Sequence, residues 1–234
     1  ASVGTVTDNG DGTWTWSFDT TDGPDESQTV TITATDSNDA ETTATFGLVV
    51  NNVDPTLVLD PVLAIDEHGM AFLTGVITDP GKWDPLTLVV NWGDLDSPSN
   101  EIREFGAVGS LHFTLPHRYL DDNPTDTPQD NYMISATLTD GDAGADTQTT
   151  SVTVNNVAPL VDAGADQTVD EGQTVDVSAS FIDAGSADTH AATIDWGDGT
   201  VDTIDPASSP VAGSHAYADN GTYTVTVTVT DDDG

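Results

Sequence analysis

Alternation of apolar and polar residues over short segments is the most regular pattern in this chain. Residues 223–230 begin with Tyr223 and continue as alternating Thr and Val, and residues 42–50 and 147–154 are similar. A period of two is typical of a half-buried β-strand. Clusters of Gly, Asp, Asn and Pro separate these segments, and no stretch shows convincing helical periodicity. The pattern predicts an all-β fold of immunoglobulin-like β-sandwich modules.

The same signals recur along the chain, which indicates internal repeats. Asn51–Pro55 returns as Asn155–Pro159, and Trp92–Asp94 returns as Trp196–Asp198, so both pairs are 104 positions apart. The strand pattern of residues 134–140 also appears at residues 30–36 and 225–231. We therefore divide the chain into module 1 (residues 1–52), module 2 (residues 53–156) and module 3 (residues 157–234).

Module 2 carries seven candidate strands, which suit two packed sheets of about seven strands in total. They are expected at Thr56–Pro61, Met70–Thr78, Leu86–Trp92, residues 101–105, Leu111–Tyr119, Tyr132–Thr139 and Thr147–Val154. Module 3 follows the same order but reaches Gly234 where its last strand should begin, and module 1 holds only a C-terminal half. We interpret these ends as fragment limits; the alternative is that a neighbouring copy donates the missing strands.

Three motifs of module 3 resemble those of the polycystic kidney disease (PKD) domain family. They are Trp196–Thr200 (WGDGT), His215–Tyr217 (HAY), and Asp219–Tyr223 (DNGTY) leading into VTVTVTD. Module 2 keeps Trp92–Asp94 and His117–Tyr119, whereas module 1 is similar to the family, or to its cadherin-like relatives, only in its terminal strands. The resemblance implies bacterial-type spacer, adhesive or accessory modules of secreted proteins, some of which bind Ca²⁺.

The charge of the chain restricts its partners. It has 41 acidic residues against 3 basic ones, for a net charge of −38. Nucleic acid and anionic membrane surfaces need clusters of Lys and Arg, so we exclude both as partners. No apolar run is long enough to insert into a membrane, and there is no Cys for disulfides. Together with the resemblance, this favours an extracellular or cell-surface location, with the chain an internal piece of a larger secreted protein.

Recognisable catalytic motifs are missing, so we expect no enzyme. There is no Gly-x-Ser-x-Gly elbow, Gly-rich phosphate loop or His-Glu-x-x-His sequence. His117 and His215 occupy equivalent positions two residues before a Tyr, which indicates scaffold hydrogen bonding. Trp92 and Trp196 are expected in the sandwich cores, and Tyr223 in a tyrosine corner that bonds back to its own loop.

The excess of Asp, 35 of the 41 acidic residues, has three explanations. Asp forms turns, it supplies the oxygen ligands that Ca²⁺ prefers, and an acidic surface is an adaptation to high salt. The skew towards Asp over Glu favours the first two, because a halophilic surface would raise both. Turn formation on a solvated surface remains the alternative to calcium binding.

We predict calcium at the module junctions, because in this strand order the N-terminal linker and two loops of each module meet at one end. Mg²⁺ fits such sites less well. The turns Asp66–Gly69 and Asp170–Gly172 are expected at the opposite end, facing the next junction, an arrangement similar to that of cadherins. The candidate ligands are Asn51, Asn52, Asp54, Asp79, Asp84, Asp140 and Asp142 for module 2, and Asn155, Asn156, Asp183, Asp188, Asp231, Asp232 and Asp233 for module 3.

These observations predict a calcium-rigidified rod or filament segment whose partners are adjacent modules or copies arranged head to tail, including a homopolymer. The linkers are short, and each contains a Pro that fixes one backbone angle. The alternative is an accessory module that binds a surface protein or a glycan. Exposed aromatic side chains would distinguish the two, and the candidates are Trp14, Trp16 and Trp83.

Overall fold

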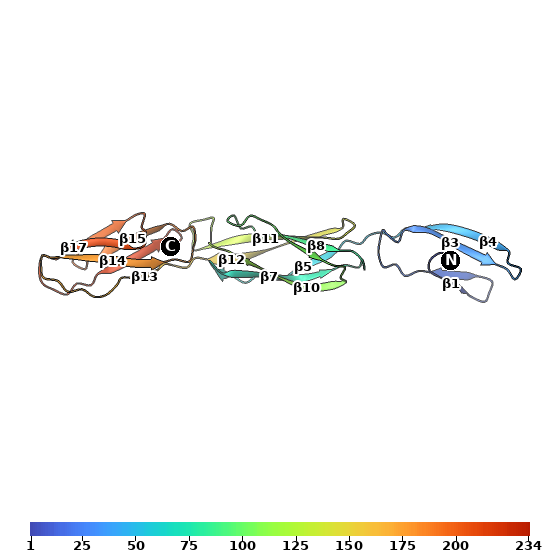
Figure 1. Cartoon of the computed structure of the whole chain (residues 1–234), viewed down its shortest axis with the longest axis horizontal. Coiled ribbons are helices and arrows are strands. Elements are labelled where there is room, and N and C mark those ends of the chain that lie inside the picture. The colour runs from blue at the N-terminus through green and yellow to red at the C-terminus, as the bar shows by residue number, and fades with distance from the viewer.

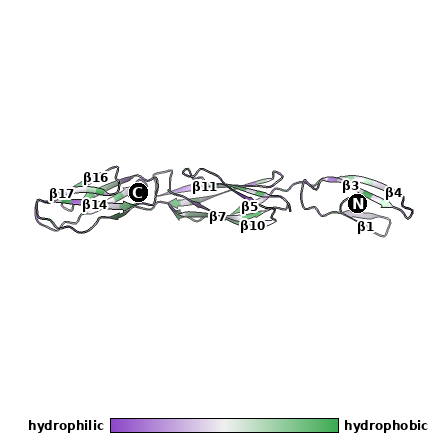
Figure 2. Cartoon of the chain, in the orientation of Figure 1, coloured by the Kyte–Doolittle hydropathy of each residue, from purple (hydrophilic) through white to green (hydrophobic).

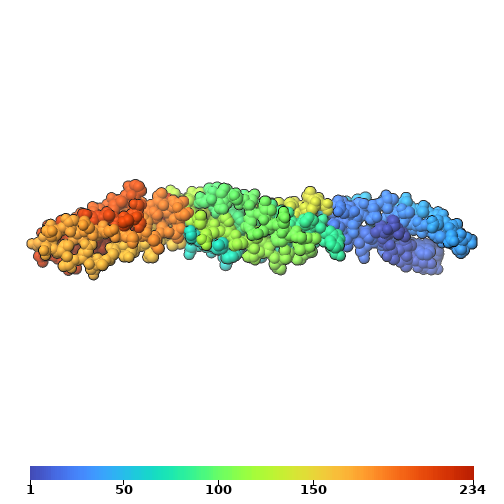
Figure 3. All heavy atoms as spheres, viewed as in Figure 1, coloured from blue at the N-terminus to red at the C-terminus, as the bar shows by residue number.

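A computed structural model describes residues 1–234 as eighteen β-strands without a helix. The strands form three units that follow one another along a single long axis (Figure 1). The space-filling view shows a continuous rod in which each unit abuts the next (Figure 3). The sequence-based prediction of an all-β tandem sandwich fold is confirmed.

Module 2 is the most complete sandwich. Its strands are β5 (Thr56–Leu59), β6 (Ile65–Asp66), β7 (Met70–Thr78), β8 (Leu86–Asn91), β9 (Glu101–Phe105), β10 (Ser110–Arg118), β11 (Gln129–Thr139) and β12 (Ala145–Asn155). One sheet has the order β10-β7-β5 and the other β6-β12-β11-β8-β9. All seven expected strands are present. Strand β6, which pairs in parallel with β12, was not predicted, because its two residues are too few to show alternation.

Module 3 repeats this plan with six strands. They are β13 (Leu160–Asp162), β14 (Thr174–Ile182), β15 (His190–Asp195), β16 (Val201–Ile204), β17 (Val211–Ala216) and β18 (Thr226–Asp231). The sheets have the orders β13-β14-β17 and β16-β15-β18, which match β5, β7, β10 and β9, β8, β11 of module 2. Residues 223–225, which were expected to begin the strand at residues 223–230, lie just outside β18. There are no counterparts of β6 and β12.

Module 1 is built from two hairpins. These pair β1 (Thr5–Asp8) with β2 (Trp14–Ser17), and β3 (Gln28–Thr35) with β4 (Glu41–Leu48). Val30 is its one buried apolar side chain. The Trp16 indole donates to the Val3 carbonyl at 2.8 Å and lies edge-on to Phe46, whereas Trp14 is exposed.

Apolar residues alternate with polar ones along the strands of the two sandwiches (Figure 2). Seventeen buried residues form the core of module 2 and seven form that of module 3. Trp92 and Trp196 are buried in these cores, as predicted. Tyr119 donates its hydroxyl hydrogen to the Trp92 carbonyl at 2.8 Å, and Tyr217 does the same to Trp196.

The equivalent histidines serve the scaffold, as predicted. The His117 ring stacks on Trp92 and lies 2.8 Å from a carboxylate oxygen of Asp94. His215 repeats both contacts, with Trp196 and with Asp198. The phenol of Tyr223 donates to the Asp219 carbonyl, as expected of a tyrosine corner. Both histidines are therefore engaged by contacts within their own module.

Candidate metal centres at the module junctions

Four segments converge where module 1 meets module 2. One is the linker around Asn52, which joins the two modules. Module 2 contributes the loop between β7 and β8 and the loop between β11 and β12. Module 1 contributes the loop that follows β2. The amide of Lys82 donates to the Thr21 carbonyl at 2.8 Å, which fixes the two modules against each other.

Two groups of carboxylates meet at this first junction. In each group, three oxygens lie within 4.8 Å of one another. Asp22, Asp84 and Asp142 form one group, and Asp79, Asp84 and Asp140 form the other. Asp84 belongs to both, so its side chain stands between them. The Asn52 amide adds a contact to Asp140 at 2.8 Å.

The second junction repeats the arrangement between modules 2 and 3. The amide of Ser186, 104 positions after Lys82, donates to the Leu120 carbonyl at 3.2 Å. Three groups of carboxylates meet here, and Asp188 belongs to each of them. They are Asp183, Asp188 and Asp231; Asp188, Asp232 and Asp233; and Glu67, Asp121, Asp122 and Asp188.

A glycine opens space for the shared carboxylate at each junction. Gly81 and Gly185 have ordinary negative φ angles, so no turn geometry demands glycine there. A Cβ atom on Gly81 would collide with the Asp84 carboxylate, and one on Gly185 would collide with Asp188 and Glu67. The common sequence Asp-x-Gly-x-x-Asp, at 79–84 and 183–188, therefore places two acidic side chains into one confined space.

Every buried side-chain oxygen that lacks a hydrogen-bond partner lies at one of these two junctions. The atoms are Asp22 Oδ1, Asp79 Oδ2 and Asp84 Oδ2 at the first, and Glu67 Oε2, Asp122 Oδ1 and Oδ2, Asn156 Oδ1, Asp188 Oδ2 and Asp231 Oδ2 at the second. A buried charged oxygen without a partner costs several kcal/mol (roughly 1–3 or more each) unless something compensates it. No Lys or Arg supplies that compensation, because the one ion pair made by these residues joins Arg103 to Glu101.

Burial and mutual repulsion raise the pKa values of the junction carboxyls. Burial is the largest cause in each case, and neighbouring carboxylates add to it. The pKa of Asp188 rises to about 8 and that of Glu67 to about 7. The pKa values of Asp84, Asp122 and Asp233 rise to about 6. The carboxylates therefore oppose their own ionisation unless a cation is bound among them.

The donor set fits a hard, multiply coordinated cation. All the convergent ligand atoms are oxygens of carboxylates and amides, the type that Ca²⁺ takes six to eight of at about 2.3–2.6 Å. Cys is absent from the chain. The His190 imidazole is hydrogen-bonded to Asp183 at 2.6 Å and so orients that carboxylate. Zn²⁺ would lack the nitrogen and sulfur ligands it prefers.

The structure brings together most of the candidate ligands named from the sequence. Asp79, Asp84, Asp140 and Asp142 gather at the first junction, and Asp183, Asp188, Asp231, Asp232 and Asp233 gather at the second. The Asn156 side-chain oxygen is buried at the second junction, and a carboxylate oxygen of Asp54 lies beside Gly144 at the first. Asn51 is exposed, and the Asn155 amide donates to Asp66, so these two stand apart.

The acidic residues that the preceding module contributes were not predicted as ligands from the sequence. These are Asp22 at the first junction and Glu67, Asp121 and Asp122 at the second. A signal for them existed in the loop before β3 and β11, where Asp22-Gly23-Pro24 resembles Asp121-Asp122-Asn123-Pro124 with one residue fewer. The turn that contains Glu67 was expected to face the next junction, but Glu67 was not named as a ligand.

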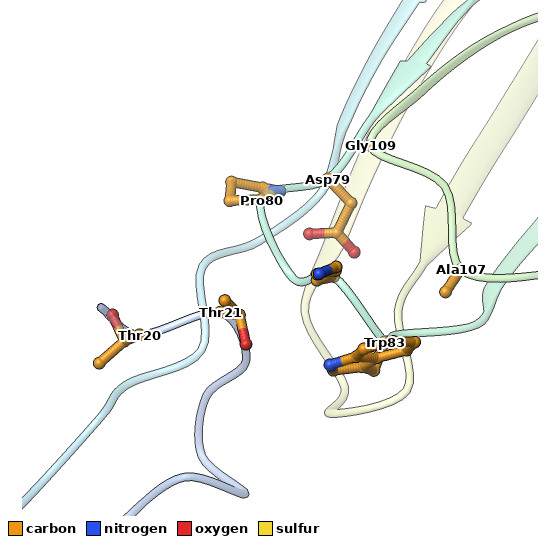
Figure 4. A pocket seen from close by; sticks show the side chains of 8 residues that line it. Thr20, Thr21, Asp79, Pro80, Trp83, Ala107 and Gly109 are labelled. Atoms are coloured by element: carbon orange, nitrogen blue, oxygen red, sulfur yellow. The ribbon is translucent and has the colours of Figure 1, made fainter. Parts of the chain in front are cut away.

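A hollow of about 510 Å³ lies beside the first junction (Figure 4). Thr20 and Thr21 border it on the module 1 side, and Asp79, Pro80 and Trp83 border it on the module 2 side. The Trp83 side chain is 65% exposed, and the Lys82 ammonium lies 5.1 Å from its ring centre. The hollow is open to solvent and offers one aromatic surface.

Residues 156–234 match the family model of the PKD domain. Module 3 thus matches the PKD domain family over its whole length. The match covers the Trp-Gly-Asp, His-x-Tyr and tyrosine-corner residues on which the resemblance rested. Module 2 shares the sheet order and the Trp–His–Asp stack of module 3, although the family model does not extend to it.

Among solved structures, one similar chain is the PKD domain of an M14-like peptidase from Thermoplasmatales archaeon SCGC AB-540-F20. It has 18% identity and a TM-score of 0.30, and the match covers 44% of this chain and 91% of that one. A tetra-tandem repeat from the extending region of a large adhesion protein has 20% identity and a TM-score of 0.41, covering 87% and 55%. Red sea bream transglutaminase has 12% identity and a TM-score of 0.31, covering 77% and 29%. No curated protein matches the chain.

Proposed function

We propose that this chain is a non-catalytic, extracellular structural or adhesive repeat segment whose module junctions are made rigid by calcium. The observation that carries the proposal is the location of the unpartnered buried oxygens: all of them lie at the two junctions, and none lies elsewhere in the chain. The chain has no helix long and apolar enough to cross a membrane.

At each junction, one group of carboxylates comes from both modules, so a cation bound in that group would join the two modules. At the first junction, Asp22 of module 1 faces Asp84 and Asp142 of module 2. At the second, the Asp121 carboxylate also accepts the Ala187 amide at 2.8 Å. A cation held between such groups opposes bending, because bending would separate its ligands. Without it, repulsion among the carboxylates would weaken the same contacts.

Calcium would thereby hold successive modules in one fixed relative orientation, so that the array forms a rigid rod. The linkers around Asn52 and Asn156 are short, which limits the motion that remains once the junction is held. Other copies or modules arranged head to tail, up to a homopolymer, are the partners that this architecture suits. Extracellular calcium, at millimolar levels, is compatible with sites of modest affinity.

The experiment is calorimetric melting of the whole chain with calcium and with EDTA, together with small-angle scattering. Calcium should raise the melting temperature and narrow the distribution of end-to-end distances. Asp84→Asn and Asp188→Asn should weaken both effects, whereas Asp166→Asn, an exposed acid outside the clusters, should not. Identical melting and scattering in calcium and EDTA would contradict the proposal and leave the aspartates as turn and surface residues.

A second candidate function is the binding of a glycan or a surface protein. The observation that favours it is the exposed Trp83 ring beside the hollow at the first junction, because sugars stack on such rings (Figure 4). A glycan array with the wild-type chain and Trp83→Ala tests it. Signals that persist in the variant would contradict a role for Trp83.

A further inference from the structure

We infer that the two junctions are unequal, and that the second takes up more calcium ions than the first and fills at a lower concentration. This inference rests on the proposed function and goes beyond it, because it assigns an order in which the rod stiffens. The reason is an asymmetry in what the preceding module contributes. Module 1 supplies Asp22 alone, whereas module 2 supplies Glu67, Asp121 and Asp122.

Glu67 is placed by the short strand that the sequence did not reveal. Strand β6 runs parallel to the end of β12, and the Glu67 amide donates to the Asn155 carbonyl at 2.9 Å. One of its carboxylate oxygens accepts the Val157 amide at 2.9 Å. The other has no partner and is directed towards Asp188 beside Gly185. The backbone thus fixes one oxygen of Glu67 and leaves the second for a ligand.

Asp122 is the most completely buried of the acidic residues, with 0% exposure, and neither of its carboxylate oxygens has a partner. Its neighbour Asp121 is engaged, since Asp121 accepts the Asp122, Asn123 and Ala187 nitrogens. In module 1 the matching loop is one residue shorter. The Thr21 carbonyl accepts an amide of the next module as the Leu120 carbonyl does, so Asp22 corresponds to Asp121 and is followed directly by Gly23-Pro24. The first junction therefore has no residue in the place of Asp122.

The unpartnered oxygens show the same imbalance, with three at the first junction and six at the second. Affinity for Ca²⁺ rises with the number of charged ligands and with their rigidity. Glu67 and Asp122 add two charged ligands to the second junction. They are also held rigidly, since each is buried and Glu67 is bonded to two backbone groups. As calcium rises, modules 2 and 3 should lock together first, while the contact between modules 1 and 2 still bends.

The test is isothermal titration of the full chain with CaCl₂, comparing the wild type, Asp22→Asn and the double variant Glu67→Gln/Asp122→Asn. Wild-type binding should occur in two steps. The double variant should lose at least one ion and weaken the tighter step about tenfold, whereas Asp22→Asn should affect only the weaker step. Asp166→Asn is the control, and melting in EDTA verifies that each variant folds; Glu67→Gln alone replaces the double variant if it does not.

Two outcomes would overturn the inference, and they are distinguishable. If the wild type takes up calcium in one step, and both variants lose the same number of ions with the same affinity, the junctions are equal and the inference is wrong while the calcium-stiffened rod stands. If the wild type takes up no calcium, both proposals fail together.

Discussion

Calcium uptake should release protons at mildly acidic pH and should release far fewer at pH 8. The carboxyls must be ionised to bind the cation, but burial raises their pKa values, so part of them carries a proton beforehand. The carboxyls with clearly raised pKa values are Glu67, Asp122, Asp188 and Asp233 at the second junction and Asp84 at the first. The perturbation is a change of pH during the titration, with no mutation required.

The size of the effect follows from these pKa values. At pH 6 a group with a pKa of about 8 is almost fully protonated, one of about 7 is about nine-tenths protonated, and one of about 6 is half protonated. Saturation with calcium at pH 6 should then release about three protons per chain, most of them from the second junction. At pH 8 only Asp188 is substantially protonated, and the release should fall below about one.

Titration calorimetry in two buffers of different ionisation enthalpy, neither of which binds calcium, counts these protons. The apparent affinity should also rise between pH 6 and pH 8, because calcium no longer competes with protons. Asp188→Asn should lower the release at pH 6 by about one proton. Equal proton release at the two pH values, or none at pH 6, would refute the claim that burial raises the pKa values of these carboxyls in the calcium-free chain.

Three further outcomes are expected. Gly185→Ala should weaken calcium binding about tenfold, since its methyl group would displace the Asp188 carboxylate, whereas Gly106→Ala, in open space, should have no effect in the same titration. Tyr119→Phe should lower the free energy of unfolding of module 2, measured in urea, by about 1–3 kcal/mol, because it leaves the buried Trp92 carbonyl without its hydrogen-bond donor. A decrease below about 0.5 kcal/mol would contradict this prediction. In EDTA, melting temperature should fall as pH rises from about 4 to about 8, because raised pKa values mean that the folded state holds protons that the unfolded state has released; a melting temperature that rises over this range would be incompatible with it.

The strands and the core were predictable because their signals are local and repeated. Alternation located β11 and β18, and the shared motif around Trp92 and Trp196 located the large core rings. Half of each candidate site was also predictable, because Asp79, Asp84 and Asp140 lie in loops that the strand order brings to one end.

The other half depends on how one module docks on the next, which no local pattern encodes. Asp22 becomes a candidate ligand only because the Thr21 carbonyl receives a bond from module 2. Glu67 is positioned by β6, whose pairing with β12 joins residues about 90 positions apart in the sequence. The burial of Asp122 likewise follows from docking, since an Asp before Asn-Pro is ordinarily read as an exposed turn residue.

Each sandwich carries one half of a junction at each of its ends. In module 2, one end has the two acidic loops, and the other has the turn that contains Glu67 and the nearby Asp121. Module 3 repeats the second half, since the Gly172 amide bonds to the Tyr217 carbonyl and brings the Glu171 turn next to the loop of Asp219, the positions that Glu67 and Asp121 hold in module 2. Duplicating a single module therefore adds a complete new joint without any other change. The length of such an array can vary over evolution while its polarity and its manner of joining stay the same.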